Sequence, residues 1–146
     1  MEDWKREAFV KKVSEEPFSR LLNMRLVDVR EGYALCEMTY TGDMDNMHGI
    51  AHGGAIFSLI DEAFEISSNS HGTVALALNM NLTYVKPALK GSIVRAESKE
   101  VTRGRKTATY DIRVTDEEGL VAICQALVYR KREEIDFLKP NSSGGR

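Results

Sequence analysis

The residue types best suited to chemistry gather between positions 46 and 65. They are Asn46, His48, Gly49, His52, Gly53, Gly54, Asp61, Glu62 and Glu65. His52-Gly53-Gly54 stands where a turn-rich loop gives way to a periodic apolar segment, which predicts the start of a helix. The first N–H groups of a helix have no partner within it and lie at its positive end, and glycines let a ligand reach them. We therefore expect this helix start to polarise a carbonyl group or to stabilise an oxyanion.

Three carboxylates follow inside the predicted helix. Asp61 lies one turn after Phe57 and borders the apolar face. Glu62 and Glu65 fall with Ser58 on a more polar side. A half-buried carboxylate such as Asp61 would serve as a general base or a nucleophile towards an acyl group. The spacing alone also fits a solvated acidic face, a histidine that only caps the helix, and glycines that only make a tight turn.

The sequence lacks the residues that several other reaction types require. His48 and His52 are four positions apart, but they lie in a loop broken by glycines and have no third matched ligand, so we expect no metal site. The sequence has no Gly-x-Ser-x-Gly elbow, phosphate loop or dinucleotide fingerprint, and we expect no bound cofactor. Cys36 and Cys124 stand in alternating apolar runs and are interpreted as buried small hydrophobes.

The charged residues nearly balance. Lys and Arg number 20 against 22 Asp and Glu, a net charge of −2 over 146 residues, which excludes a protein that binds nucleic acid through a strongly basic surface. One basic cluster stands around a single turn, at Arg95, Lys99, Arg103, Arg105 and Lys106. This cluster would attract a phosphorylated ligand, and it also fits a solvated hairpin end.

Length and composition fit a single domain. The chain is long enough to fold without disulfides or metals, and 42% hydrophobic with 29% charged residues is an ordinary globular composition. No segment approaches the roughly 18 apolar residues of a membrane span, and the N-terminus has no apolar run of signal-peptide length. We expect a cytoplasmic protein without membrane contact. Residues 1–131 are expected to form the domain, and the charged residues 132–146 a disordered tail.

Short elements precede the candidate site. Sparse apolar residues at 3–16 suit an amphipathic helix, which Pro17 ends. Strand-like runs at 25–30 and 33–40 are separated by a Glu-Gly turn and predict a hairpin. A loop over 41–49, dense in turn formers, leads to the candidate residues.

One long helix carries most of these residues. From Gly54 to about Ser70 or His71, apolar residues recur with the period of one helix face, and Gly72 is the expected stop. The residues of this face are Ile56, Leu59, Ile60, Ala63 and Phe64.

After the helix, the period changes to two. Strands are predicted at 76–85, 92–102, 106–115 and 120–130, and their short turns favour antiparallel neighbours. In the first strand one face is expected to carry Leu76, Leu78, Met80, Leu82 and Tyr84. The last strand is apolar at nearly every position and is expected to be covered on both faces. We expect an α+β domain with the sheet wrapped on the helix, and an edge-to-edge dimer that covers a sheet edge.

Two runs of sequence carry a resemblance to a known family. The first is Asn46-Met47-His48-Gly49-Ile50-Ala51-His52-Gly53-Gly54-Ala55 with Leu59-Ile60-Asp61-Glu62-Ala63, and the second is Asn79-Met80-Asn81-Leu82-Thr83-Tyr84-Val85-Lys86-Pro87-Ala88. Both resemble the hotdog-fold acyl-CoA thioesterases of the PaaI-like (phenylacetate-pathway) type. The likeness covers about residues 18–131, and Asn46, His52 and Asp61 recur with the family's spacing.

The resemblance implies a fold, an assembly and a reaction. The fold is a long central helix wrapped by a curved antiparallel sheet of about five to six strands. The assembly is a dimer with two active sites at its interface, often doubled to a tetramer. The reaction is hydrolysis of an acyl-CoA thioester, in which coenzyme A is part of the substrate and no cofactor is needed.

The resemblance also implies roles for single residues. The Gly53 N–H would polarise the thioester carbonyl, His52 would position the thioester, and Asn46 would hold the attacking water or the acyl group. Asp61 of the partner subunit would be the nucleophile or the general base. We add Gly54 to the substrate-binding residues, and on charge alone Arg103, Arg105 and Lys106 for the phosphates of coenzyme A.

One departure and two alternatives stay open at this point. Some family members have a Ser or Thr just before the Asn79-Met80-Asn81 segment, where this chain has Ala77, so Asn46 is expected to position the water alone. A hotdog hydratase or dehydratase acting on acyl-CoA is the first alternative. A non-catalytic module that binds acyl-CoA is the second. The acyl group itself cannot be read from the sequence.

Overall fold

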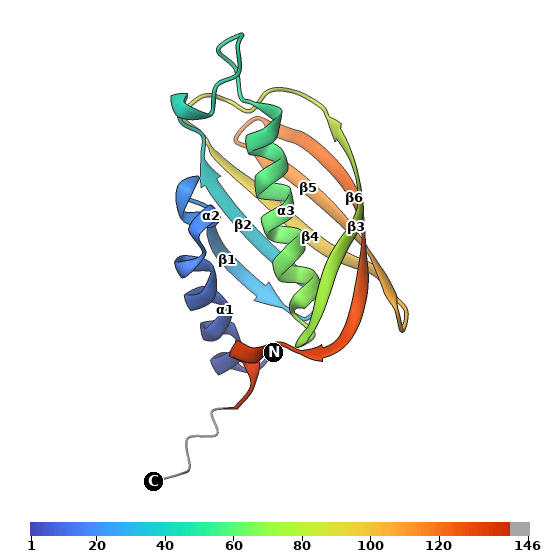
Figure 1. Cartoon of the computed structure of the whole chain (residues 1–146). Coiled ribbons are helices and arrows are strands. Elements are labelled where there is room, and N and C mark those ends of the chain that lie inside the picture. Colours follow the sequence, from blue (N-terminus) through green and yellow to red (C-terminus); the bar gives the residue numbers. More distant parts are fainter. Residues whose placement is uncertain (141–146) are drawn as a thin grey trace.

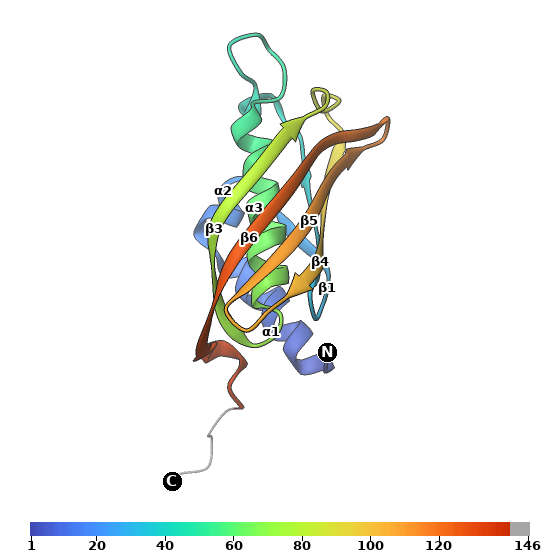
Figure 2. The ribbon, with the colours of Figure 1, turned by 90° about the vertical axis from the view of Figure 1, so that its right-hand side faces the viewer.

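The computed structural model describes residues 1–140. Helix α3 (Gly53–Asn69) lies along one face of a six-stranded antiparallel sheet (Figure 1). The strands, in the order in which they pair, are β1 (Arg25–Arg30), β2 (Tyr33–Thr39), β4 (Ile93–Arg103), β5 (Thr107–Asp116), β6 (Gly119–Glu134) and β3 (Thr73–Tyr84). The remaining elements are α1 (Asp3–Glu15), α2 (Pro17–Leu21) and the short 3-10 helices η1 (Gly42–Met44) and η2 (Asp136–Leu138). The sheet curves past α3 (Figure 2), and the predicted α+β hotdog architecture is confirmed.

The predicted apolar face of α3 forms the centre of the core. Its residues are each at most 3% exposed: Ile56, Leu59, Ile60, Ala63 and Phe64. Phe64 also packs edge-on against Tyr110 of β5, with 5.5 Å between the ring centroids. Burial of one large apolar side chain contributes about 1.5–3 kcal/mol. This face therefore fixes the rotation of α3 about its axis, and with it the residues that point away from the sheet.

The order of the strands differs from the prediction at one connection. β1 with β2, and β4 with β5 and β6, are antiparallel neighbours joined by short turns. β3 does not pair with β4, which follows it in sequence, but with β6, and β4 pairs with β2. Residues 85–92 are enough to cross the end of the sheet instead of forming a tight hairpin (Figure 1). As a result, β3 has one free edge.

A β-bulge divides the faces of β3. Ala77 pairs with Val128 and Asn79 with Leu127, so Leu78 is an extra residue between two adjacent positions of β6. The prediction that Leu76, Leu78, Met80, Leu82 and Tyr84 share one face is therefore wrong. Beyond the bulge, Met80 and Tyr84 pair with the buried residues Ala126 and Ala122 and share the helix-facing side. Before it, Leu76 pairs with the exposed Tyr129 on the outer side.

Strand β6 is buried on only one face. The prediction of cover on both faces is wrong for the single chain, since Ile123 is 37% and Tyr129 41% exposed. The alternating residues between them, such as Cys124 and Ala126, are buried against the helix side. Cys36 is buried as well, and both cysteines are free thiols, as predicted.

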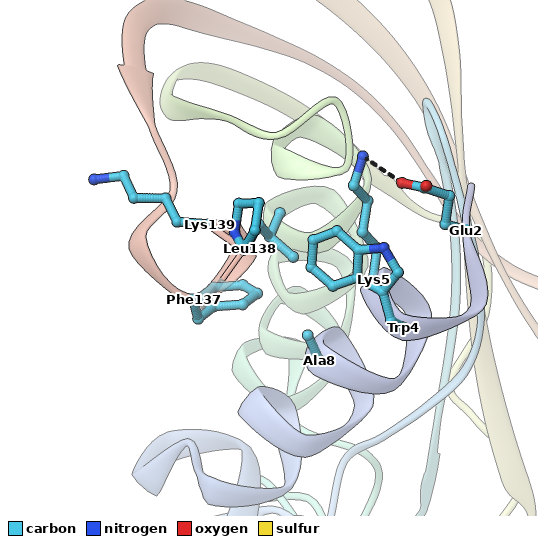
Figure 3. Close-up of a pocket in the computed structure, with 8 residues that line it drawn as sticks. Glu2, Trp4, Lys5, Ala8, Phe137, Leu138 and Lys139 are labelled. Carbon is cyan, nitrogen blue, oxygen red and sulfur yellow. Dashed lines mark ion pairs between the residues drawn. The ribbon is translucent and has the colours of Figure 1, made fainter. Parts of the chain in front are cut away.

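The C-terminal boundary predicted at residue 131 is also wrong. β6 continues to Glu134, and η2 follows it. Phe137 packs edge-on against Phe9 of α1, with 5.3 Å between the ring centroids, and Figure 3 shows Phe137 and Leu138 beside Trp4. Apolar side chains at 135–138 explain this packing, which the charged composition of the segment obscured. The rest of the predicted tail, 141–146, lies outside the described residues.

No helix within residues 1–140 combines the length and the apolar character needed to cross a membrane.

Candidate active site

The loop before α3 is held in place by hydrogen bonds. Tyr40 at the end of β2 donates its hydroxyl hydrogen to the Asp45 carboxylate, and Lys90 donates to the same carboxylate at 3.1 Å. The His52 N–H donates to the Met44 carbonyl at 2.7 Å. These contacts fix both ends of the loop that carries Asn46 and leads directly into α3.

Asn46 uses part of its side chain to shape this loop. Its Oδ1 accepts hydrogen bonds from the N–H groups of His48 at 2.8 Å and Ile50 at 3.3 Å. A side-chain carbonyl that bonds the backbone two residues ahead makes an Asx-type turn. The Nδ2 group has no acceptor among residues 1–140. Asn46 can therefore offer a donor to a ligand, while its acceptor is already engaged.

His52 is the N-cap of α3, as one of the alternative interpretations expected. Its Nδ1 accepts a hydrogen bond from the Gly54 N–H at 2.9 Å. A neutral imidazole whose Nδ1 accepts carries its hydrogen on Nε2. Capping and catalysis are therefore compatible, because the cap leaves an exposed Nε2–H as a donor. The Gly54 N–H, which we assigned to substrate binding, is occupied by this cap.

Gly53 carries a backbone donor that is free within the described chain. Gly53 is the first residue of α3, and none of residues 1–140 accepts a hydrogen bond from its N–H. A Cβ at this position would lie 3.0 Å from the hydroxyl oxygen and Cζ of Tyr84. The Tyr84 hydroxyl donates to the Gly53 carbonyl at 2.8 Å. The tyrosine therefore packs on this glycine and holds the peptide that follows the free N–H.

The bond from Tyr84 was not predictable from the sequence, which placed the residue only on one face of a strand. Residues Ile50, Ile56, Tyr84, Val85 and Pro87 help to line an open hollow of about 320 Å³ next to Gly53. Its lining is mainly apolar. Such a hollow beside a backbone donor suits a ligand with an apolar body and one carbonyl group.

Tyr84→Phe tests the positioning role. Loss of a hydrogen bond of this kind costs about 1 kcal/mol, so kcat is expected to fall roughly fivefold while KM stays nearly constant, because the ring still lines the hollow. The measurement is steady-state kinetics of thioester cleavage. Tyr129→Phe, at an exposed tyrosine on the outer face of β6, is the matched control. An unchanged kcat for Tyr84→Phe would contradict the assignment.

Asp61 lies on the side of α3 that faces away from the sheet. It is exposed and has no ion pair or hydrogen bond with any of residues 1–140. The surrounding protein atoms remove part of its hydration and thereby raise the pKa of this carboxyl above its usual 3.8. A free carboxylate of raised basicity is suited to accept a proton.

One chain does not bring Asp61 to Gly53. Eight helical residues put about 12 Å along the axis between them, whereas a base or nucleophile and an oxyanion donor must both lie about 3 Å from one reacting group. The structure therefore places His52 and Gly53 together at the start of α3, and it leaves Asp61 apart from them.

One of the two neighbouring glutamates differs from its predicted placement. Glu65 is exposed, as expected, but Glu62 is only 3% exposed, and its Oε1 has no hydrogen-bond partner. The prediction that Glu62 lies on the polar side of the helix is wrong. The buried face of α3 is wider than its stripe of apolar residues, because α1 and α2 also cover Glu62.

The basic residues assigned to the substrate lie at the opposite end of α3. Arg103 donates to Nδ1 of His71, which follows the C-terminal end of α3, and its Nε lies 3.9 Å from the Glu100 carboxylate. The helix is about 24 Å long. Within one chain, Arg103, Arg105 and Lys106 are thus not near Gly53, and a role there would require the basic residues of another subunit.

Comparisons with known proteins identify the family of this chain. The thioesterase superfamily matches residues 48–123. A putative esterase of Archaeoglobus fulgidus is 44% identical over 116 residues, which cover 79% of this chain and 75% of the relative. The acyl-coenzyme A thioesterase PaaI of Escherichia coli is 32% identical over 100 residues, covering 68% of this chain and 71% of the relative.

A comparison with solved structures supports the same family. The structure of the E. coli PaaI protein from the phenylacetic acid degradation operon superimposes with a TM-score of 0.84 at 28% identity, covering 88% of this chain and 94% of the other. The matched segment includes the helix start with its free N–H and the helix that carries Asp61. The chain therefore belongs to the thioesterase superfamily, among its PaaI-like hotdog members.

Proposed function

We propose that this protein is an acyl-CoA thioesterase, which hydrolyses an acyl-CoA to the free acid and coenzyme A. The observation that carries the proposal is the free Gly53 N–H at the positive end of α3, flanked by the Nε2–H of His52 and an apolar hollow. A thioester carbonyl in the hollow would accept from Gly53 as its oxygen gains charge. The names of PaaI and of the family support the same substrate class.

The reaction needs one proton acceptor. In the proposed mechanism Asp61 takes a proton from water, the resulting hydroxide forms a bond to the carbonyl carbon, and Gly53 stabilises the oxyanion. When the oxyanion collapses, the C–S bond breaks and the sulfur receives the proton from Asp61. Direct attack by Asp61 on the carbonyl, followed by hydrolysis of the anhydride, uses the same arrangement. Both routes require Asp61 as the carboxylate.

A second copy of the chain completes the proposed site. Since Asp61 lies about 12 Å from Gly53 along its own helix, the carboxylate at Gly53 must be Asp61 of the partner subunit. The free edge of β3 favours this assembly, because an exposed strand edge with unpaired N–H and C=O groups readily pairs with another strand. Leu76 and Leu78 on β3 are 49% and 57% exposed, and an edge-to-edge dimer would cover them.

The test is release of free thiol from a panel of esters: acetyl-, hexanoyl-, palmitoyl-, phenylacetyl-, benzoyl- and hydroxybenzoyl-CoA. Hydrolysis of at least one ester, without hydration of crotonyl-CoA, is the expected result. Hydration would indicate the hydratase alternative. Tight binding of the esters without thiol release would contradict catalysis and indicate a binding module. The panel also identifies the acyl group that the hollow prefers.

The pH dependence of the activity follows from Asp61. Desolvation raises its pKa above 3.8, so protonation removes the base at a higher pH than for a free aspartate. We expect kcat/KM to fall with decreasing pH on a limb whose midpoint lies above 3.8, and to be level near neutral pH. The measurement is a profile between about pH 4 and 8, with Tm recorded at each pH. Constant activity down to pH 4 in a folded protein would contradict the role of Asp61.

A further inference from the structure

Three carboxylates outside the proposed site meet where the N-terminal helices pack on α3. Glu16 is the residue between α1 and α2, and Glu62 and Glu65 lie about one turn apart on α3. One carboxylate oxygen from each residue lies within 4.8 Å of the others. Local sequence patterns could not predict this cluster, because Glu16 is distant from α3 along the chain.

Glu62 has one carboxylate oxygen that lacks a partner in the described chain. The residue is 3% exposed, and its Oε1 is the buried side-chain atom without a hydrogen bond among residues 1–140. Buried polar atoms in folded proteins nearly always have a partner, either in the protein or in a bound species. An orphaned carboxylate oxygen that faces two more carboxylates points to a bound cation.

No positive side chain among residues 1–140 forms an ion pair with this cluster. The other buried glutamate shows the contrast, because Glu37 is paired with both Arg25 and Arg95. The loss of hydration caused by the surrounding protein atoms, and then the charge of Glu16, raise the pKa of Glu62 to about 9 and that of Glu65 to about 7.

The hollow beside the cluster leaves a path to solvent. It has a volume of about 260 Å³ and is lined in part by Glu16, Glu65 and Lys12. The ammonium of Lys12 lies 5.9 Å from the centre of the Phe137 ring, which lines the same hollow, and Lys12 makes no ion pair with the three glutamates. Water in such a hollow can complete the ligand shell of an ion that the protein binds from one side.

We propose that Glu16, Glu62 and Glu65 bind a hard divalent cation, with one carboxylate oxygen from each as a ligand. Hard cations select oxygen ligands, and two oxygens on opposite sides of Ca²⁺ at 2.3–2.6 Å lie about 5 Å apart. The three oxygens lie within 4.8 Å of one another, so a single ion of this size can contact all of them. The bound ion joins the α1–α2 junction to the helix that carries Asp61.

The experiment measures binding and stability, and it does not depend on the enzymatic activity. Full-length protein is treated with EDTA and then exchanged into metal-free buffer, and Tm is measured with CaCl₂, MgCl₂ or MnCl₂ against KCl of equal ionic strength. Calorimetric titration counts the ions bound per chain. At ten times the dissociation constant the stabilisation corresponds to a rise in Tm of about 5 °C. We expect one saturable ion per chain for at least one of the three salts.

Matched variants identify the ligands. Glu62→Gln and the exposed Glu65→Gln are each expected to abolish the shift in Tm and the calorimetric signal, and Glu62→Gln keeps the shape of the buried side chain. Glu15→Gln removes an exposed charge next to the cluster, where Glu15 pairs with Lys11, and should bind as the wild type does. If none of the salts shifts Tm more than KCl does, or if both Gln variants retain the shift, the proposal is overturned and the cluster holds only protons.

Discussion

Asp61→Asn is expected to lower kcat by about 10²- to 10⁴-fold, the usual loss when a general base is removed. Asparagine keeps the size of the side chain but cannot accept the proton from water or attack the thioester. KM should change little, because the substitution leaves the free N–H of Gly53 and the hollow beside it unaltered. The measurement is thiol release at saturating substrate.

The same substitution should leave the fold intact. Asp61 is exposed and makes no ion pair with the described residues. Its pKa is raised in the folded protein, so at neutral pH the folded state disfavours the charged form slightly, and neutral asparagine should keep Tm equal or raise it. Asp3→Asn, at an exposed carboxylate of α1, serves as the control. Activity of Asp61→Asn near that of the wild type would exclude the residue as base and as nucleophile.

The helix that positions the site was predictable because its evidence is local. The apolar period of Ile56, Leu59, Ile60, Ala63 and Phe64 can arise only if one face of the helix is buried, and all five are buried. The His52-Gly53-Gly54 start follows from capping chemistry in the same way. Both features depend on residues within a few positions of one another.

The features that escaped prediction depend on contacts between distant segments. The burial of Glu62 depends on α1 and α2 packing over α3, which the sequence pattern of α3 alone does not contain. The bulge at Leu78 moves later side chains of β3 to the other face, and alternation in one strand cannot reveal an extra residue relative to its partner. The pairing of β3 with β6 likewise depends on how residues 85–92 cross the sheet.

The candidate site was predictable in its residue types but not in its geometry. The motif groups Asn46, His52, Gly53 and Asp61 within sixteen positions, which suggests one compact site. In the structure the helical rise separates Asp61 from His52 and Gly53 by more than a substrate carbonyl can bridge. A linear sequence shows neither this separation nor the second chain that would resolve it.

Gly53→Pro is expected to reduce kcat by about 10²- to 10³-fold, the range for loss of one oxyanion donor. Proline has no N–H, yet it is well tolerated as the first residue of a helix. His52 has φ −65° and ψ 130°, which is the conformation that a residue before proline prefers. The substitution therefore removes the N–H donor without breaking the start of α3. The Cδ of the proline ring also fills the space in front of the former donor.

Gly53→Ala is the control that keeps the N–H. Both variants place a Cβ about 3.0 Å from the Tyr84 ring, so both should lose some stability and some activity as that ring shifts. Only the proline variant also loses the donor. The ratio of the two kcat values thus isolates the effect at the N–H. Equal kcat values for the two variants would contradict the role of Gly53.

Combining the two inactive variants tests whether the site is shared between subunits. Asp61→Asn retains Gly53, and Gly53→Pro retains Asp61, so a mixed dimer has one site built from two unaltered residues and one site with both altered. Co-expression with two different tags, followed by purification on both, isolates this dimer. Its activity should be about half that of the wild type, although each parent variant is nearly inactive. If Asp61 instead served Gly53 of its own chain, each site would carry one defect and the mixed dimer would stay as inactive as its parents.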